Sequence, residues 1–155
     1  MPPRRTAQIL ALLIPLALMA GALGSQYFGG LYPCEMCMWQ RWPHYAAIAA
    51  AALSFVVKPA RDTLVWLAVV GIASSGGIGA FHAGVEYGWW EGLTRCATNF
   101  ASGGSALDSI MNAPLIRCDV APWDFLGISL AGWNAIVSLG GALVIAVLMF
   151  KGRQA

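Results

Sequence analysis

Two cysteines three positions apart give the sequence its clearest chemical signal. Cys34 and Cys37 lie in a short polar interruption between two long apolar runs, and Arg41 follows the second cysteine by four residues. A cysteine pair at the start of a helix is suited to redox chemistry, because the helix N-terminus and a nearby cation both favour a thiolate. The acidic Glu35 between the two cysteines acts against a thiolate. The rest of the sequence must indicate what this pair exchanges electrons with.

Cys96 and Cys118 are the other two cysteines, and four cysteines allow three pairings. The short spacing makes Cys34–Cys37 the most economical first pair, which leaves Cys96–Cys118 as the second. As staples, the two disulfides would contribute about 1.9 and about 3.4 kcal/mol respectively, so stabilisation explains the first pair poorly and exchange explains it better. A zinc site is the other alternative, but one Cys-x-x-Cys with two distant cysteines matches zinc-ribbon spacing poorly.

Arg41 lies one helical turn beyond Cys37, on the same face of the expected helix. It either steadies negative charge on a Cys37 thiolate or a reduced acceptor, or extends from the membrane interface toward water as an anchor. His82 is expected at the depth of the cysteine pair, where it suits a proton or hydrogen-bond donor. His44 is predicted to be interfacial, on another part of its helix. No metal site is predicted.

The composition indicates a bilayer as the solvent. Of the 155 residues, 59% are hydrophobic and 10% are charged, whereas soluble domains have roughly 45–50% apolar and about 25% charged residues. A chain of this length predicts one domain, here a single integral-membrane domain over residues 1–155. The net charge of +2 is too small to indicate a nucleic-acid partner.

Four apolar runs predict an all-α membrane protein, a bundle of four transmembrane helices. A helix needs about 20 residues to cross the hydrocarbon core. The second run is marginal, because its apolar part rises only about 24 Å, so it includes residues 39–41 or crosses a thinned membrane. The first run also has features of a cleavable signal peptide, although its length favours a retained span. The expected spans are approximately 7–28, 40–57, 63–85 and 124–150.

The charge distribution predicts the orientation. Six of the nine basic residues lie at the two termini and in the turn before the third span, whereas six of the seven acidic residues lie in the loops 29–39 and 86–123 or, for Asp124, directly after the second of them. The positive-inside rule therefore places both termini in the cytoplasm and both cysteine-bearing loops outside. In a bacterial inner membrane these loops are periplasmic, in the compartment where disulfides persist. The six basic residues are Arg4, Arg5, Lys58, Arg61, Lys151 and Arg153.

The second outer loop also carries apolar residues at helical spacing, Leu107, Ile110 and Met111, behind a possible N-cap at Ser105. This pattern predicts a short amphipathic helix that lies on the membrane surface or packs against the loop's own interior.

Small residues in the third run, Gly71, Ser75 and Gly79, recur every four positions and predict a helix-packing face. Asn134, expected near mid-membrane, is predicted to form hydrogen bonds between helices.

Together these features resemble the DsbB family of disulfide bond formation proteins, which are inner-membrane thiol:quinone oxidoreductases. The resemblance covers nearly the whole chain. Its most specific parts are Pro33-Cys34-Glu35-Met36-Cys37 with Gln40-Arg41, then His82-Ala83-Gly84-Val85-Glu86 with Trp89-Trp90, and Cys118-Asp119 leading to Gly132-Trp133-Asn134.

The resemblance implies a function and a set of site residues. A reduced periplasmic DsbA-type oxidase with a thioredoxin fold would exchange with Cys96–Cys118 through a mixed disulfide, and electrons would pass to Cys34–Cys37. From there they would reach a membrane quinone, ubiquinone or menaquinone, which Arg41 and His82 help to polarise. A DsbA–DsbB–quinone route of this kind keeps the bacterial periplasm oxidising.

Three alternatives stay open from the sequence. Many relatives have Leu where Met36 stands, which is compatible with a specialised paralogue that serves one dedicated partner. A membrane metal carrier would use the cysteines and histidines as ligands. A four-span scaffold would use the two disulfides as staples that resist mild reductant equally, whereas a redox enzyme needs at least one labile pair.

Overall fold

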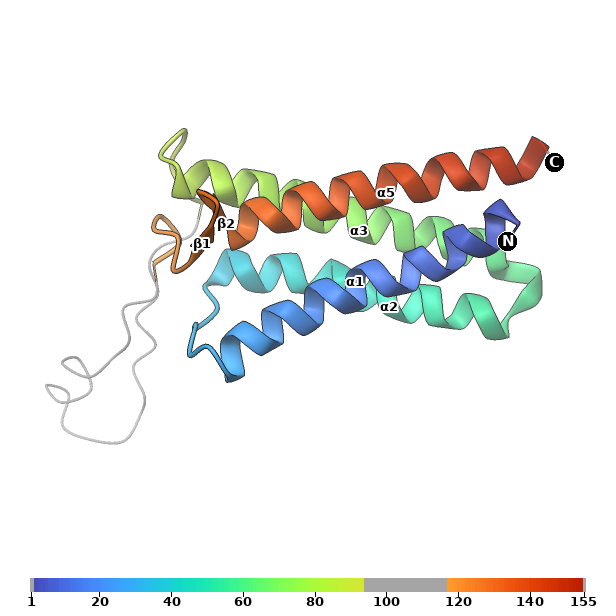
Figure 1. Ribbon diagram of the computed structural model, residues 1–155, viewed down its shortest axis with the longest axis horizontal. Helices are drawn as coiled ribbons and strands as arrows, with labels where there is room; N and C mark the ends of the chain where they lie inside the picture. Colours follow the sequence, from blue (N-terminus) through green and yellow to red (C-terminus); the bar gives the residue numbers. More distant parts are fainter. Residues whose placement is uncertain (1, 94–116, 155) are drawn as a thin grey trace, which may run out of the picture.

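Four long helices run side by side along the molecule (Figure 1). The structure is a computed structural model that describes residues 2–93 and 117–154. A short 3-10 helix connects the second and third long helices, and a two-stranded hairpin precedes the last. The elements are α1 (Pro3–Tyr27), α2 (Glu35–Val56), η1 (Lys58–Ala60), α3 (Arg61–Glu86), β1 (Asp124–Phe125), β2 (Ile128–Ser129) and α5 (Leu130–Gln154).

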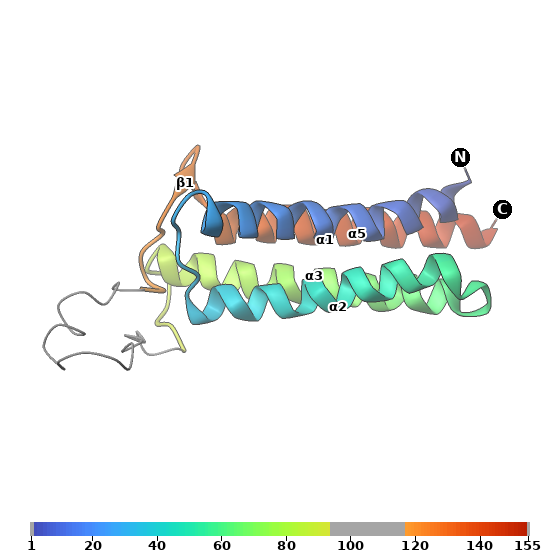
Figure 2. The same cartoon turned by 90° about the horizontal axis from the view of Figure 1, so that it is seen from below.

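The four helices form a bundle of two layers, with α1 beside α5 in one layer and α2 beside α3 in the other (Figure 2). The helix α3 packs most extensively, against both α2 and α5, and α1 closes the ring against α5 and α2. Both chain ends lie at the same end of the bundle as the turn between α2 and α3 (Figure 1). There Arg4 donates to the Gly152 carbonyl at 2.8 Å and forms an ion pair with Asp62 at 2.9 Å.

The bundle has many small side chains in its core and many large apolar side chains on its outside. Branched residues such as Val70 and Leu143 are 60% and 66% exposed, an arrangement that water would penalise and lipid does not. Three helical segments, 3–27, 58–86 and 130–153, are long and apolar enough to cross a membrane, and α2 is a fourth helix beside them. Six of the eleven described residues of the buried core cluster are alanines, which come from all four helices: Ala7, Ala11, Ala47, Ala51, Ala68 and Ala142.

The predicted packing face of small residues on α3 is confirmed. A Cβ atom at Gly71 would lie 2.8 Å from a carbonyl oxygen of α2, and one at Gly79 would lie 2.9 Å from the Asn134 side chain of α5. Between them, the buried Ser75 hydroxyl donates to the Gln40 carbonyl at 2.8 Å. The small residues therefore let α3 approach both neighbours closely, as this spacing does in membrane helices.

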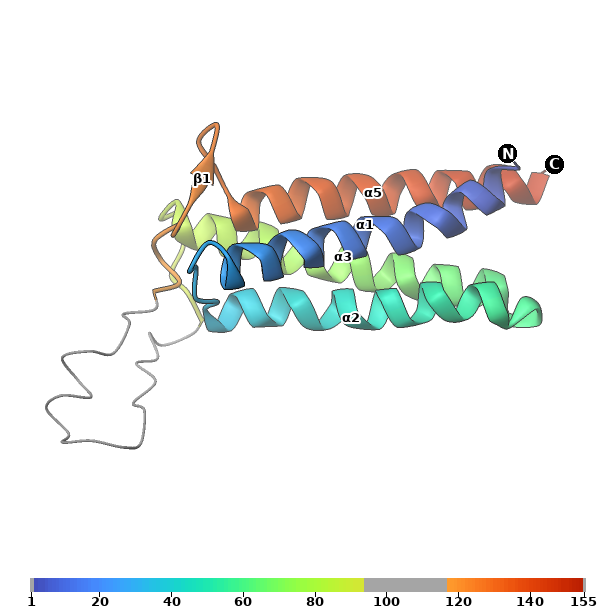
Figure 3. The same ribbon diagram turned by 60° about the horizontal axis from the view of Figure 1, so that its bottom comes forward.

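The start of the last helix differs from the prediction. A span was predicted from Asp124, but α5 begins at Leu130, because β1 and β2 form a hairpin in between. Its two-residue turn has positive φ at both Leu126 (56°) and Gly127 (75°), the conformation that matches the twist of paired strands. The Ser129 hydroxyl then accepts a backbone N–H in the first turn of α5. The hairpin projects from the end of the bundle opposite the termini (Figure 3).

The helix predicted around residues 105–115, and Cys96, lie outside the described residues. The start of α2 is also earlier than the expected span, at Glu35, so the polar segment that carries the cysteine pair belongs to the helix itself.

Candidate functional site

The cysteine pair lies where α2 begins. Cys34 is the N-cap residue, and its Sγ accepts the backbone N–H of Cys37 at 3.1 Å. The Sγ atoms of Cys34 and Cys37 are 2.6 Å apart. This places both sulfurs at the positive end of the helix dipole, where a thiolate is stabilised. The pair is therefore positioned to form and break a disulfide with little movement of the backbone.

The two thiols are not equivalent. The hydrogen bond with the Cys37 sulfur, together with burial, raises the pKa of the Cys34 thiol well above its ordinary value, although the backbone N–H of Cys37 acts in the opposite direction. In the reduced pair, this favours a first negative charge on Cys37 over one on Cys34. Of the two, Cys37 is also the one that lines the apolar cavity between the helices, described below.

Cys118 packs against the first cysteine pair. It is buried in one cluster with Cys34, Met36 and Val85, and Cys37 lies against this cluster. The neighbouring Arg117 donates two hydrogen bonds to Asp119, at 2.6 and 2.9 Å, and these bonds lower the pKa of that carboxyl.

His82 and Glu86 lie on the last two turns of α3, and His82 is next to the cysteine pair. His82 Nε2 is 3.7 Å from Cys34 Sγ and 3.8 Å from Glu86 Oε1. His82 is almost fully buried. Its ring is therefore placed to stabilise charge on the sulfurs, as the sequence predicts for its position, whereas the proximity of Glu86 was not predicted.

Arg41 is buried, with 8% of its surface exposed, and connects α2 to α1. Its guanidinium donates to Gln26 Oε1 at 2.6 Å and to the Ala22 carbonyl at 3.2 Å. Among residues 2–93 and 117–154, no carboxylate forms an ion pair with Arg41. A buried cation that is bonded only to neutral oxygens strongly attracts negative or partly negative oxygen atoms.

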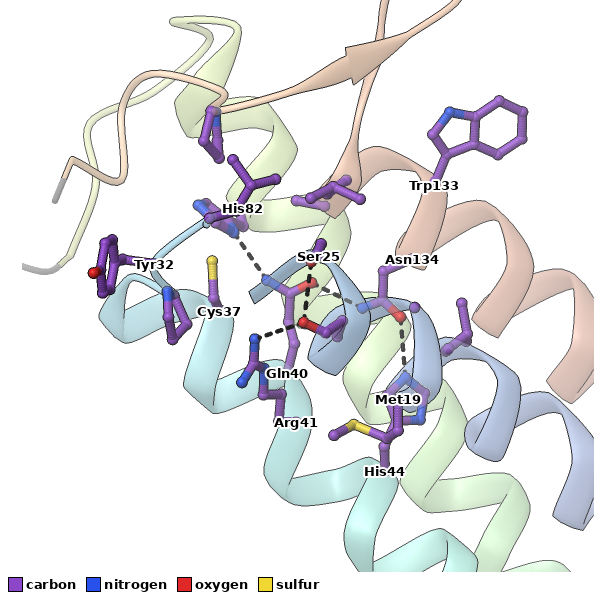
Figure 4. Close-up of a pocket in the computed structure, with 18 of the residues that line it drawn as sticks. Met19, Ser25, Tyr32, Cys37, Gln40, Arg41, His44, His82, Trp133 and Asn134 are labelled. Carbon is purple, nitrogen blue, oxygen red and sulfur yellow. Dashed lines mark hydrogen bonds between the residues drawn. The ribbon is translucent and has the colours of Figure 1, made fainter. Parts of the chain in front are cut away.

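A cavity of about 210 Å³ opens beside the cysteine pair, and its wall is mostly apolar. Side chains of all four long helices line it, with residues of the loop before α2 at its rim. Figure 4 shows polar groups of the wall, which come from all four long helices. They include Ser25 of α1, Cys37, Gln40, Arg41 and His44 of α2, His82 of α3 and Asn134 of α5, and Glu86 of α3 also lines the cavity.

A second cavity, of about 270 Å³, lies against the same cysteines from the side of the outer loop. Cys34, Cys37 and His82 line it together with Arg117 and Val120. The cysteine pair therefore borders both the apolar cavity between the helices and a space beside the segment that carries Cys118.

A buried hydrogen-bond network connects the histidines across three helices (Figure 4). His82 Nδ1 is 2.8 Å from Gln40 Nε2, and Gln40 Oε1 accepts from Asn134 Nδ2 at 2.8 Å. Asn134 Nδ2 also donates to Ser75, and Asn134 Oδ1 is 3.0 Å from His44 Nε2. The prediction that Asn134 bonds between helices is thus confirmed. The prediction that His44 is interfacial is wrong, because its hydrogen bond to α5 holds it in the interior.

Gln40 was assigned no role from the sequence, although it stands beside Arg41 in the motif that carries the resemblance. In the structure it joins His82 to Asn134. Of the predicted site residues, Cys34, Cys37, Cys118, Arg41 and His82 lie at one end of the bundle.

Comparison with known proteins gives consistent matches. The family model described as "Disulfide bond formation protein DsbB" matches residues 4–148. The relative from Methylococcus capsulatus is 30% identical and aligned over 90% of each chain. A relative from Polaromonas is 29% identical, over 96% of this chain and 92% of its own, and one from Nitrosomonas europaea is 28% identical, over 94% and 93%. All three are named "Disulfide bond formation protein B". No solved structure matches the chain.

Proposed function

Because this chain belongs to the DsbB family of disulfide bond formation proteins, we propose that it oxidises a periplasmic DsbA-type thiol oxidase and passes the electrons to a membrane quinone. The family makes it a helical membrane protein with an oxidoreductase role in disulfide formation. The proposal adds the partner, the acceptor and the route of the electrons. That route runs from Cys96–Cys118 to Cys34–Cys37 and then to the cavity.

One observation carries the proposal: the Cys34–Cys37 pair lies between Cys118 and an apolar cavity. Cys118 belongs to the same buried cluster as Cys34, and Cys37 and Arg41 line the cavity. A pair in this position is able to receive electrons from one side and release them on the other. A structural staple has no need of either neighbour.

The thiol chemistry follows from the order of the sulfurs. A thiolate of the reduced partner attacks Cys96, forms a mixed disulfide and releases Cys118 as a thiolate. Cys118 attacks its neighbour Cys34, which forms a Cys34–Cys118 disulfide and expels Cys37 as a thiolate. The second thiol of the partner then resolves the mixed disulfide, which releases the oxidised partner and frees Cys96. Attack of Cys96 on Cys118 restores the second pair and leaves Cys34 and Cys37 reduced.

The residues of the cavity fit a quinone. The wall is largely apolar, as a ring with an isoprenoid tail requires, and it offers the Arg41 guanidinium and the Cys37 sulfur as polar neighbours. His44 Nδ1, which is buried and has no hydrogen-bond partner among the described residues, gives a further polar group. A bound quinone, ubiquinone or menaquinone, would accept two electrons and two protons and become a hydroquinone, while the Cys34–Cys37 disulfide forms again.

Arg41 would hold a quinone oxygen by charged hydrogen bonds, which are stronger than neutral ones. His82 would stabilise the charge that develops on the sulfurs, since Nε2 is 3.7 Å from Cys34 Sγ. The apolar wall would keep water from the reacting groups. The net reaction is a partner dithiol plus quinone giving a partner disulfide plus hydroquinone.

We place the protein in the bacterial inner membrane with four spans, α2 being the fourth. The positively charged end of the bundle, with both termini and η1 (Figure 1), would face the cytoplasm. The cysteine-bearing segments at the opposite end would face the periplasm. This orientation gives the cysteine pairs access to a periplasmic oxidase and gives the cavity access to the quinone in the bilayer.

Metal binding is a second candidate, because Sγ of Cys34, Sγ of Cys37 and a ring nitrogen of His82 lie within 4.8 Å of one another. Two thiolates and an imidazole are good zinc ligands. A metal carrier would bind zinc stoichiometrically when reduced, whereas the redox function predicts that added quinone re-forms the disulfide. Metal analysis of the reduced, purified protein before and after quinone addition distinguishes the two.

Trapping tests the proposed route. In the Cys118→Ser variant Cys96 is a free thiol, which is expected to attack the disulfide of the oxidised periplasmic partner, form a mixed disulfide with it and release the second thiol of the partner. Acid quenching followed by alkylation of that released thiol traps the complex. Mass spectrometry of the trapped complex identifies the partner and the cysteine. A complex joined through Cys34 in place of Cys96, or no complex with any thioredoxin-fold protein, would contradict the route.

A further inference from the structure

His44 has a buried nitrogen that the proposed thiol chemistry does not use. The residue is 3% exposed and lines the apolar cavity, and its Nδ1 atom has no hydrogen-bond partner among the described residues. Its other ring nitrogen, Nε2, is bonded to Asn134 (Figure 4). Buried polar atoms are nearly always hydrogen-bonded, so an unpartnered one at the wall of a cavity indicates a group that the occupant of the cavity supplies.

The network around His44 determines whether Nδ1 is a donor or an acceptor. Gln40 Nε2 faces the Met36 carbonyl, which only accepts, so Gln40 Oε1 must face Asn134. Asn134 Nδ2 accordingly donates to Gln40 Oε1 and to the Ser75 carbonyl. The Asn134 oxygen is then the atom 3.0 Å from His44 Nε2, so Nε2 carries the ring proton. In the neutral ring, Nδ1 is left as a hydrogen-bond acceptor.

Arg41 and His44 Nδ1, which both lie at the cavity wall, therefore differ in the oxygen groups that they bond. Arg41 has only donors, so it bonds a carbonyl oxygen and a hydroxyl oxygen alike. His44 Nδ1, as an acceptor, bonds a hydroxyl group but gains nothing from a carbonyl. A site built to bond a hydroxyl discriminates strongly against an analogue that lacks it. Of these two residues at the cavity wall, Arg41 thus serves both forms of a quinone, whereas His44 Nδ1 serves the reduced form alone.

We propose that His44 Nδ1 accepts a hydrogen bond from a ring hydroxyl of the bound hydroquinone, so that the cavity binds hydroquinone more tightly than quinone. The inference rests on the proposed function, because it assigns a residue to the same cavity. Tighter binding of the reduced form makes the bound quinone a stronger oxidant and so favours oxidation of the Cys34–Cys37 pair. His44 is in this sense a residue that tunes the acceptor.

The test measures binding of each form and not turnover. Both affinities for a short-chain ubiquinone analogue are measured anaerobically, in a full-length background with Cys34→Ser and Cys37→Ser so that neither form is converted. With His44→Phe, hydroquinone affinity is expected to fall about tenfold, which is the loss of about one hydrogen bond, while quinone affinity changes less than about twofold. Ser54→Ala, which removes a buried polar group from the same helix away from the cavity, should leave both affinities unchanged.

A second measurement does not depend on whether the His44 variant folds. Nitrogen NMR of the histidine-labelled background protein is expected to show His44 Nδ1 unprotonated, with a resonance that shifts on adding hydroquinone but not on adding quinone. A protonated Nδ1, or equal shifts with both forms, would overturn the inference, as would equal losses of affinity for both forms in His44→Phe. If neither form binds the background protein, the proposed function itself fails.

Discussion

Replacement of Asn134 by Leu tests whether the buried polar network holds the site together. The Asn134 side chain bonds three residues on two other helices: Gln40 and His44 on α2, and Ser75 on α3. Hydrogen bonds between membrane helices contribute about 0.6 kcal/mol each on average. Asn134→Leu keeps the branched shape of the side chain but removes all three bonds, so the free energy of unfolding should fall by about 2 kcal/mol. The loss is larger if Gln40 Oε1 and His44 Nε2 stay unsatisfied.

The assay is reversible unfolding in detergent micelles by titration with dodecyl sulfate, followed by far-ultraviolet circular dichroism. Ser54→Ala is the matched control, since it removes one interhelical bond, from Gln8 at 3.0 Å, and should cost about 0.6 kcal/mol. If Asn134→Leu is as stable as the wild type, or loses no more than Ser54→Ala, the network does not hold α2, α3 and α5 in register and the reasoning is refuted.

Three further variants address the charge, the thiols and the packing of the site. Arg41→Met removes the charged hydrogen bonds to a quinone oxygen and should weaken quinone binding about tenfold or more in an equilibrium binding assay. Cys37→Ala removes the main cause of the raised pKa of Cys34, so alkylation of Cys34, followed by mass spectrometry, should begin at a lower pH than in the reduced wild type. Gly84→Ala puts a Cβ atom into the Trp90 ring, so tryptophan fluorescence should change and stability should fall by about 1–3 kcal/mol.

Each of these variants has its own control or contrary result. Arg41→Lys keeps the charge and should retain part of the quinone affinity, whereas wild-type affinity in Arg41→Met would exclude this residue from the site. Unchanged alkylation of Cys34 across the pH range in the Cys37 variant would show that burial alone raises its pKa. Gly77→Ala adds the same atom to α3 where nothing lies within 4 Å, so it should be silent.

Much of the fold could be predicted from the sequence, because lipid requires long apolar helices and these are visible as runs of residues. The close packing of α3 was also predictable, since Gly71, Ser75 and Gly79 follow a fixed period. The hairpin before α5 was not predictable, because it depends on a left-handed backbone at Leu126, a conformation that leucine rarely adopts. The residues of this hairpin are mostly apolar, like those of a membrane span, so their composition does not distinguish the hairpin from the start of the helix.

The sequence predicts which residues form the site better than it predicts which residues they contact. The cysteines, Arg41 and His82 are identified by type, spacing and expected depth in the membrane. The environment of His44 depends on Asn134, which lies 90 positions away in the sequence, and no local pattern indicates that contact. The partners of Arg41 on α1 were unpredictable for the same reason, because they depend on how two helices face each other across the bundle.

The proposed relay is tested most directly by counting electrons. The protein is placed in lipid nanodiscs with a known amount of ubiquinone, and a reduced DsbA-type oxidase is added without oxygen. The relay predicts that one hydroquinone forms for each pair of partner thiols oxidised, and that Cys37→Ser forms none although the partner still reaches Cys96. Hydroquinone formation by Cys37→Ser at the wild-type rate, or thiol oxidation by the wild type without quinone reduction, would contradict it.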